Sequence, residues 1–232
     1  MSIKKLGYLK EIRNTLKKPV DTIITLIRDK VSFIMRTDIL GKKIKGTDDI
    51  ITSIGDIKSL GVQKLQGVEI NNKEWIIINP NTLEKIELKI KGTDDIITSI
   101  GDIELLGSKK VKRVKINNKE RICINPKTLE AIKVKGTEDI ITDIGGTETL
   151  GSKKVQKVKI NNKEWIIINP KTLEALKVKG TEDIITDAGD IKSLGGQKIQ
   201  EVKVNNKKQI FINPKTLETI KVKAIDQKIV KI

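Results

Sequence analysis

Apolar and polar residues alternate along short stretches of this chain, and turn residues separate the stretches. The segment VKINNKEWIIINPKTLEALKVKG, which begins at Val158, opens with such an alternation and reaches an Asn-Asn step at 161–162. An apolar run follows, then an Asn-Pro step at 169–170, and then a second alternation, LEALKVK, at 173–179. Alternation with a period of two is typical of a strand with one buried face, and Asn and Pro favour turns. The segment therefore predicts a three-stranded antiparallel meander.

The length of the first turn decides which side chains share a face of the sheet. A two-residue Asn-Asn loop would place Ile160 on the same face as Trp165. A three-residue Asn-Asn-Lys loop would place Ile160 with Ile166 and Ile168 instead, because one extra residue flips the following strand. The second arrangement gathers the better apolar residues, so we predict the three-residue loop. The predicted core positions of the repeat are Ile76, Ile78, Ile122, Ile124, Ile166, Ile168, Ile210 and Ile212.

The same unit occurs four times. The copies begin at Gly46, Gly92, Gly136 and Gly180, so the periods are 46, 44 and 44 residues. Such periods indicate a solenoid, a propeller or a linear array of small units that bury their apolar faces against one another. We expect a mainly β fold: four tandem 44–46-residue antiparallel β-meander repeats after a short α-helical N-terminal segment. The expected divisions are 1–40, 41–91 (with a lead-in strand), 92–135, 136–179 and 180–232 (with a C-terminal cap).

Each copy opens on a segment that fits two structures, GTDDIITSIG or GTEDIITDIG. As a helical turn in the third copy, Thr137 would cap it, the acids after it would suit the helix dipole, and Gly145 would end it. As a strand, 140–142 is a short β-branched run. We favour a strand or an extended segment, which would give each unit a fourth strand and the size of a propeller blade.

Residues 1–40 lack the turns of the repeat and show a helical period instead. Apolar residues spaced by four, three, four and three positions form a heptad seam, and Pro19 suits the first turn of a helix. The seam is β-branched throughout, which favours three or more helices over two. We predict a segment that joins copies of the chain; packing on the chain's own β array and binding to a membrane surface are the alternatives. The seam residues are Val20, Ile24, Ile27, Val31 and Ile34.

Composition limits what can fill the core. Hydrophobic residues make up 37% of the chain but aromatic residues only 2%, so Ile, Val and Leu must do the packing. The lone Cys123 excludes an intrachain disulfide framework, and it stands where other copies have Ile or Phe, which favours a core residue over a reactive thiol. An Ile-, Lys- and Glu-rich chain fits a hot habitat, or equally an AT-rich genome. No secretory signal is visible, and no apolar run approaches the ~20 residues of a membrane span.

The sequence offers few groups for catalysis. It contains no His, which excludes His-based nucleophilic sites and His metal ligands, and its glycines form no phosphate-binding loop. Adjacent carboxylates open each copy, but neighbours on a strand point apart, so we predict that they are solvated or cap a turn. We expect no enzyme activity, no cofactor and no metal. The carboxylate pairs are Asp48-Asp49, Asp94-Asp95, Glu138-Asp139 and Glu182-Asp183.

One strand position varies between copies, from Trp to Arg to Trp to Gln. It lies on the face opposite the predicted core, beside a Lys in three of the copies. A Trp here would stack on a sugar or a base, and the alternative is a half-exposed position under little constraint. The net charge of +16 favours a polyanionic partner such as nucleic acid or an acidic glycan. The residues of this ligand face are Trp75, Arg121, Trp165, Gln209, Lys115 and Lys159.

A helical segment, PVDTIITLIRDKVSFIM, that leads into tandem GTDDIITSIGDIKSLG units resembles virion structural proteins of viruses that infect thermophiles. It also resembles repetitive microbial surface adhesins. The resemblance covers the whole chain and rests on its general sequence pattern, not on a shared motif. It implies a non-enzymatic, oligomeric protein that is built into tails, fibres or caps.

These observations together predict a structural protein of a virion tail, fibre or surface appendage. We expect it to form a homo-oligomer, a trimer or larger, and to bind other structural subunits and a host-surface glycan. Its location would be a virion or a cell surface, after synthesis in the cytoplasm. The alternatives are a Lys-rich module that binds nucleic acid or an acidic glycan, and a multivalent lectin that uses Trp75 and Trp165.

Overall fold

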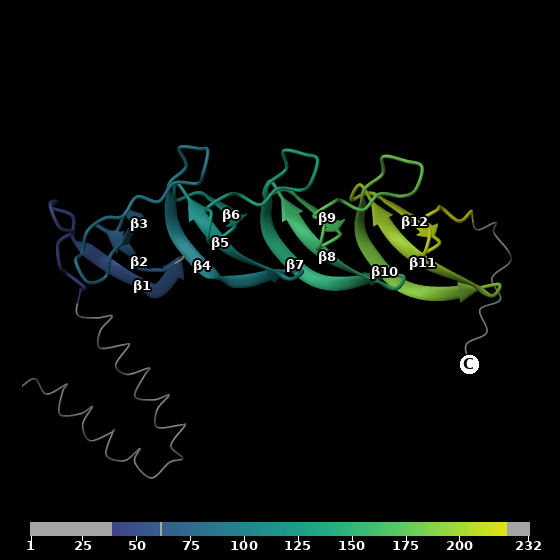
Figure 1. Ribbon diagram of the computed structural model, residues 1–232, viewed down its shortest axis with the longest axis horizontal. Coiled ribbons are helices and arrows are strands. Elements are labelled where there is room, and N and C mark those ends of the chain that lie inside the picture. The colour runs from purple at the N-terminus through teal and green to yellow at the C-terminus, as the bar shows by residue number, and fades with distance from the viewer. Residues whose placement is uncertain (1–38, 61, 222–232) are drawn as a thin grey trace, which may run out of the picture. The chain divides into compact units, whose positions relative to one another are not determined.

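The computed structural model describes residues 39–60 and 62–221, and the regular elements among them are all β-strands (Figure 1). The strands form four antiparallel sheets of three, each in the order of the chain. A mainly β fold of tandem meanders is therefore confirmed. The strands are β1 (Ile51–Leu60), β2 (Gln63–Ile70), β3 (Glu74–Ile78), β4 (Ile97–Leu106), β5 (Lys109–Ile116), β6 (Glu120–Ile124), β7 (Ile141–Leu150), β8 (Lys153–Ile160), β9 (Glu164–Ile168), β10 (Ile185–Leu194), β11 (Gln197–Val204) and β12 (Lys208–Ile212).

The first strand of each sheet comes from the segment that fitted two structures. In the third repeat this segment is β7, ten residues long and paired antiparallel with β8. The preference for a strand is confirmed, and the segment contributes the first of three strands, not the fourth of four. The β-branched run and the following residues up to Leu150 extend far beyond a single turn, because β8 offers a partner along their whole length.

The prediction of a sheet strand at 173–179 is wrong. This segment forms only the isolated bridges Ile168↔Ala175 and Lys177↔Ile184. Leu176 donates its backbone N–H to Ile167 at 2.9 Å and accepts one from Ile185 at 2.8 Å. The alternating side chains thus belong to a connection that hydrogen-bonds to two successive sheets in turn, and it carries the chain from one repeat to the next.

The predicted three-residue hairpin loop is confirmed. In the third repeat Ile160 pairs with Glu164 and Val158 pairs with Ile166, which leaves 161–163 as the loop. Both Asn residues of the loop adopt positive φ, 48° and 57°, a region that Asn enters more readily than most residues. The loop closes through a hydrogen bond from the Lys163 N–H to the Ile160 carbonyl at 2.9 Å. The other three repeats have the same pair of positive φ angles at their Asn-Asn steps.

The first strand of each repeat curves, as β4, β7 and β10 show in Figure 1. In β7 the pairing with β8 shifts twice, once at Thr142 and once at Gly145-Gly146. At the second shift Gln156 donates its side-chain amide to the Gly145 carbonyl at 2.8 Å. At the first, the Thr142 hydroxyl donates to the Lys159 carbonyl at 3.2 Å. These side chains replace the ladder hydrogen bonds that a bulge removes.

The described residues divide into two compact units, 39–57 with 64–86 and 58–63 with 87–221, where residue 61 is not described. The first unit contains most of the sheet β1–β3 and its own apolar cluster. The second unit contains three complete sheets. The cluster of the first unit consists of Ile39, Ile44, Ile51, Val68, Ile70, Ile76 and Ile78.

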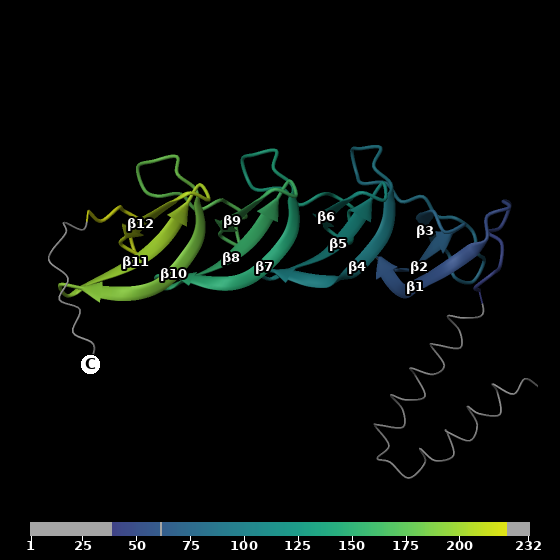
Figure 2. The same ribbon diagram turned by 180° about the vertical axis from the view of Figure 1, so that it is seen from behind.

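The cores of the second unit lie between successive sheets, which follow one another in a row in Figure 1 and in the reverse view of Figure 2. Ile166 and Ile168 of β9 pack in one cluster with Leu106 and Cys123 of the second repeat. Ile167, between them on the strand, points to the other face and joins a cluster with residues of the fourth repeat. The middle sheet, β7–β9, is therefore buried on both faces, and it shares one core with the second repeat and another with the fourth.

Hairpin tips add a second contact between neighbouring repeats. Gly151, at the tip between β7 and β8, lies so close to the turn of the fourth repeat that a Cβ would come within 2.4 Å of the Pro214 carbonyl oxygen. Its φ of 64° also favours glycine. Beside it Gln200 donates to the Thr149 carbonyl at 2.9 Å and accepts from the Gly151 N–H at 3.0 Å. The third and fourth repeats are therefore joined by polar as well as apolar contacts.

The predicted helical segment, with its seam Val20, Ile24, Ile27, Val31 and Ile34, lies outside the described residues except for its last two positions. The predicted cap, 224–232, lies wholly outside them. Within 39–60 and 62–221 the chain has no helix that is long and apolar enough to cross a membrane.

Candidate binding site

The predicted core isoleucines lie at the interior of the sheets. Ile76, Ile78, Ile122, Ile124, Ile166, Ile168 and Ile212 are buried, and Ile210 of the last sheet is half-buried. The opposite face is more covered than the sequence indicated. Its residues Ile77, Cys123 and Ile167 are at most 1% exposed. In the second unit the following repeat packs on Cys123 and Ile167.

The two Trp residues of the predicted ligand face pack against glycines of their own sheets. A Cβ on Gly145 would lie 3.0 Å from the Trp165 ring, and a Cβ on Gly55 would lie 3.4 Å from the Trp75 ring. Each ring thus covers a glycine of the first strand, which has no side chain of its own to shield the backbone. Both rings are half-buried, and their contacts within the chain account for that burial.

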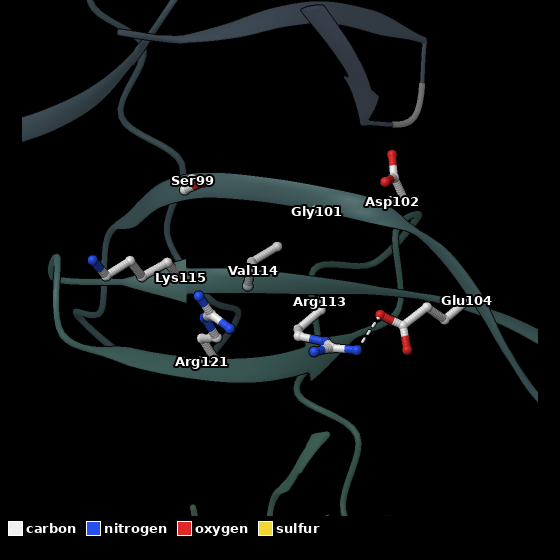
Figure 3. A pocket seen from close by; sticks show the side chains of 8 residues that line it. All are labelled: Ser99, Gly101, Asp102, Glu104, Arg113, Val114, Lys115 and Arg121. Atoms are coloured by element: carbon white, nitrogen blue, oxygen red, sulfur yellow. Dashed lines mark hydrogen bonds and ion pairs between the residues drawn. The ribbon is translucent and has the colours of Figure 1, made fainter. Parts of the chain in front are cut away.

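The second repeat lacks this Trp, and a shallow hollow of about 320 Å³ occupies the same face (Figure 3). Arg121 stands at the Trp position and is exposed. The hollow lies over strands β4, β5 and β6. Its lining residues are Ser99, Gly101, Asp102, Glu104, Arg113, Val114, Lys115 and Arg121.

Most charges around the hollow are paired. The Arg113 guanidinium contacts Glu104 at 2.7 Å and Asp143 of the next repeat at 2.9 Å. Asp102 accepts a hydrogen bond from Lys58, which lowers the pKa of its carboxyl. The third repeat continues the same scheme, since Lys157 at the position of Arg113 contacts an Asp of the fourth repeat at 2.7 Å.

One row of residues across the second sheet has no acid in it. Lys115 pairs with Ser99 on β4 and with Arg121 on β6, so two cations stand directly opposite each other. Neither forms an ion pair with another described residue. In the third and fourth repeats the first residue of the row is an Asp and the last is uncharged. Those rows are Asp143–Lys159–Trp165 and Asp187–Lys203–Gln209.

A lysine also lies beneath this face. Lys112 is only 4% exposed and donates to the Gly101 carbonyl at 3.4 Å, at the position where the other repeats have a buried Gln. Burial lowers the pKa of Lys112, and the nearby charge of Lys58 lowers it further. On the neighbouring strand, burial raises the pKa of the Cys123 thiol to about 12. That thiol is therefore protonated at neutral pH, as a core residue would be.

The carboxylate pairs at the start of each copy lie apart from the hollow. In the third repeat Glu138 pairs with Lys133, which lowers the pKa of the Glu138 carboxyl. Its neighbour Asp139 accepts a hydrogen bond from the Asn161 side chain at 2.7 Å. The two acids thus hold separate local contacts, and no cluster of three potential metal ligands occurs among the residues that the structure describes.

The sequence indicated Arg121 and Lys115 but missed Ser99, Arg113, Glu104 and Lys112. Their common signal is that each differs in charge or polarity from the aligned residue of at least one other copy. Comparison with protein-family models and with curated proteins finds no match for this chain.

Proposed function

We propose that this protein is a non-enzymatic structural component of a virion tail, fibre or surface appendage, in which the repeats form a rigid interaction surface. The apolar cores shared between successive repeats support this proposal most. Ile166 and Ile168 lie in one cluster with residues of the preceding repeat, while Ile167 lies in a cluster with residues of the following one. A sheet that is buried on both faces resists bending, because any change of angle would open a core.

Two further features support a display role. The connections between sheets, such as 133–140 between β6 and β7, carry exposed Lys and Glu residues held in ion pairs. Charged residues of mixed sign keep such a surface soluble while other subunits bind it. The resemblance to virion and adhesin proteins suggests the setting, and the heptad seam at 20–34 suggests how copies of the chain would join.

Light scattering coupled to size exclusion tests the assembly over a range of protein concentrations. We expect a mass several times the chain's 25.9 kDa. A variant with two charges in the seam, Ile27→Asp with Val31→Asp, should fall to the mass of one chain. The control places the same two charges off the seam, Thr25→Asp with Ser32→Asp, and should keep the mass of the original.

A single-chain mass for the unaltered protein at every concentration would overturn the assembly part of the proposal. The same conclusion would follow if both double variants behaved alike. Circular dichroism of each variant should show an unchanged β spectrum, since the substitutions lie outside the repeats. Images of the purified assembly should show elongated particles with the arrays at their surface, and round aggregates would contradict a fibre.

A further inference from the structure

We propose that the hollow of the second repeat binds one phosphate or sulfate group through Ser99, Lys115 and Arg121. These three residues form one row across β4, β5 and β6, and all three line the hollow. Figure 3 shows the Lys115 ammonium pointing away from the two guanidinium groups, with Arg121 between Lys115 and Arg113. Such a binding site is separate from the role of the repeats as a scaffold.

The charge available to a ligand lies on Lys115 and Arg121. Arg113 is neutralised by Glu104 at 2.7 Å and Asp143 at 2.9 Å, so its charge is not available to a ligand. Lys115 and Arg121 form no ion pair with a described residue, and like charges placed directly opposite on adjacent strands destabilise a sheet. Each of the other repeats avoids this arrangement with Trp or Gln at the position of Arg121. A bound anion would remove the repulsion in the second repeat.

The three residues also carry the hydrogen-bond donors that an oxyanion needs. A guanidinium presents two parallel N–H groups to an oxyanion, an ammonium adds a point charge, and a hydroxyl donates one further hydrogen bond. This set suits the several oxygens of a phosphate or sulfate. Ser99 also favours anion binding in the second repeat. The third and fourth repeats have an Asp at this position, and its charge would repel an anion.

The hollow suits a ligand with a single anionic group. Asp102 and Glu104 line the other part of the hollow, where they pair with Lys58 and Arg113, so that part offers no cation to a second phosphate. At about 320 Å³ the hollow is larger than one oxyanion, so it leaves room for a neutral substituent. The ligand class is therefore an uncharged molecule, such as a sugar, that bears one phosphate or sulfate ester. A long polyanion would need a continuous row of cations, which the acids interrupt.

Acylation of surface lysines, read by mass spectrometry of the full chain, tests the site. The probes are inorganic phosphate, inorganic sulfate, glucose 6-phosphate and a short single-stranded DNA, each against sodium chloride of equal ionic strength. We expect the first three to slow the acylation of Lys115 severalfold, because a bound anion covers its ammonium. Lys159, at the same position of the third repeat, is the internal control and should react at an unchanged rate.

The variant Arg121→Gln should weaken the protection by about tenfold or more in ligand concentration, since it removes a charged donor. Gln occupies this position in the fourth repeat as Gln209, so the variant is expected to fold. If it does not fold, Lys115→Glu, the residue of the first repeat, replaces it, and loss of the glucose 6-phosphate heat signal in calorimetry is then the readout. Protection by glucose 6-phosphate at a lower concentration than inorganic phosphate would indicate an ester ligand. Equal protection by the two would indicate a free oxyanion.

Equal protection of Lys115 and Lys159, or protection that survives Arg121→Gln, would overturn the proposal, as would an equal effect of chloride. Protection of many lysines by the DNA alone would also overturn it, because it would indicate nucleic-acid binding over the general basic surface. None of these results bears on the mass of the assembly, so the site and the structural role fail or stand separately.

Discussion

The second and third repeats have the same strands and the same register, but they differ along one face. Val114 pairs with Ile122 as Val158 pairs with Ile166, and the hairpin loops have the same conformation. At one position of the third strand, however, one repeat has Arg121 and the other has Trp165. The two backbones tolerate both, so the fold depends on turns, bulges and cores that are alike in the two repeats. The remaining positions are free to differ in charge and in binding.

The largest effects should come from the positions that the two repeats share. Ile124 and Ile168 are both 0% exposed and occupy the same position of the repeat. Replacing either with Ala removes buried methyl groups and leaves a cavity, so we expect each variant to lose about 2–5 kcal/mol of unfolding free energy. Urea denaturation followed by circular dichroism measures the loss.

Ile210→Ala supplies a less buried comparison for these two variants. Its side chain is half-buried at the edge of the cluster between the third and fourth repeats. The loss should be clearly smaller than at the two inner positions. If Ile124→Ala cost as little as Ile210→Ala, the second repeat would not share the tight core of the third.

The second and third repeats also differ in one buried side chain of the third strand. Cys123 and Ile167 occupy the same strand position and are both 0% exposed. Because burial raises the pKa of the thiol from 9.0 to about 12, its thiolate fraction at pH 8 falls by about a thousandfold. We expect the folded protein to react about a thousandfold more slowly with iodoacetamide than the same chain in denaturant.

Two variants in a Cys123→Ile background decide whether the buried position is responsible. Ile167→Cys should be as slow to react as Cys123, because the same position of the next repeat is equally covered. Lys163→Cys, in an exposed hairpin loop, should react at an ordinary rate. A fast Ile167→Cys would show that the two repeats are not equivalent at their cores.

Much of this fold follows from local sequence signals. The Asn-Asn-Lys loop set the register at 161–163, because its length alone decides which face each following side chain joins. That register correctly separated Ile166 and Ile168 from Trp165. The sequence favours a strand at β7 but does not require one, since the Gly-bounded run also suits a helical turn. Its pairing with β8 depends on contacts that the segment itself does not reveal.

The sequence failed where a residue's partner lies in the next repeat. LEALKVK alternates like a strand, yet its backbone bonds to two sheets in turn, and no local pattern distinguishes these cases. The Arg113–Asp143 ion pair was missed for the same reason, since it joins residues 30 positions apart in different repeats. The Trp165 ring covers Gly145, and this contact depends on the folded sheet and not on a local pattern. Residue-by-residue alignment of the copies would have marked these positions but not their contacts.

The smallest effect concerns the buried side chain at the bulge. Gln156 donates to Gly145 at 2.8 Å, whereas Lys112 reaches Gly101 at only 3.4 Å and carries a charge. Lys112→Gln should therefore stabilise the protein at neutral pH by about 0.5–1.5 kcal/mol, the net contribution of one amide hydrogen bond. The removal of a buried charge acts in the same direction. Thermal unfolding at several pH values measures the difference between the two proteins.

The pH dependence identifies the cause. Burial lowers the pKa of Lys112 below its ordinary 10.5, so the folded chain releases this proton at lower pH than the unfolded chain does. The unfolded state then binds more protons, and the stability of the original protein rises through the window between the lowered pKa and 10.5. The stability that Lys112→Gln gains should shrink as the pH rises across that window. Gln156→Lys should instead lose stability, and this loss should shrink across the same window. A difference that stays constant with pH would mean that packing, and not the buried charge, separates the two repeats at this position.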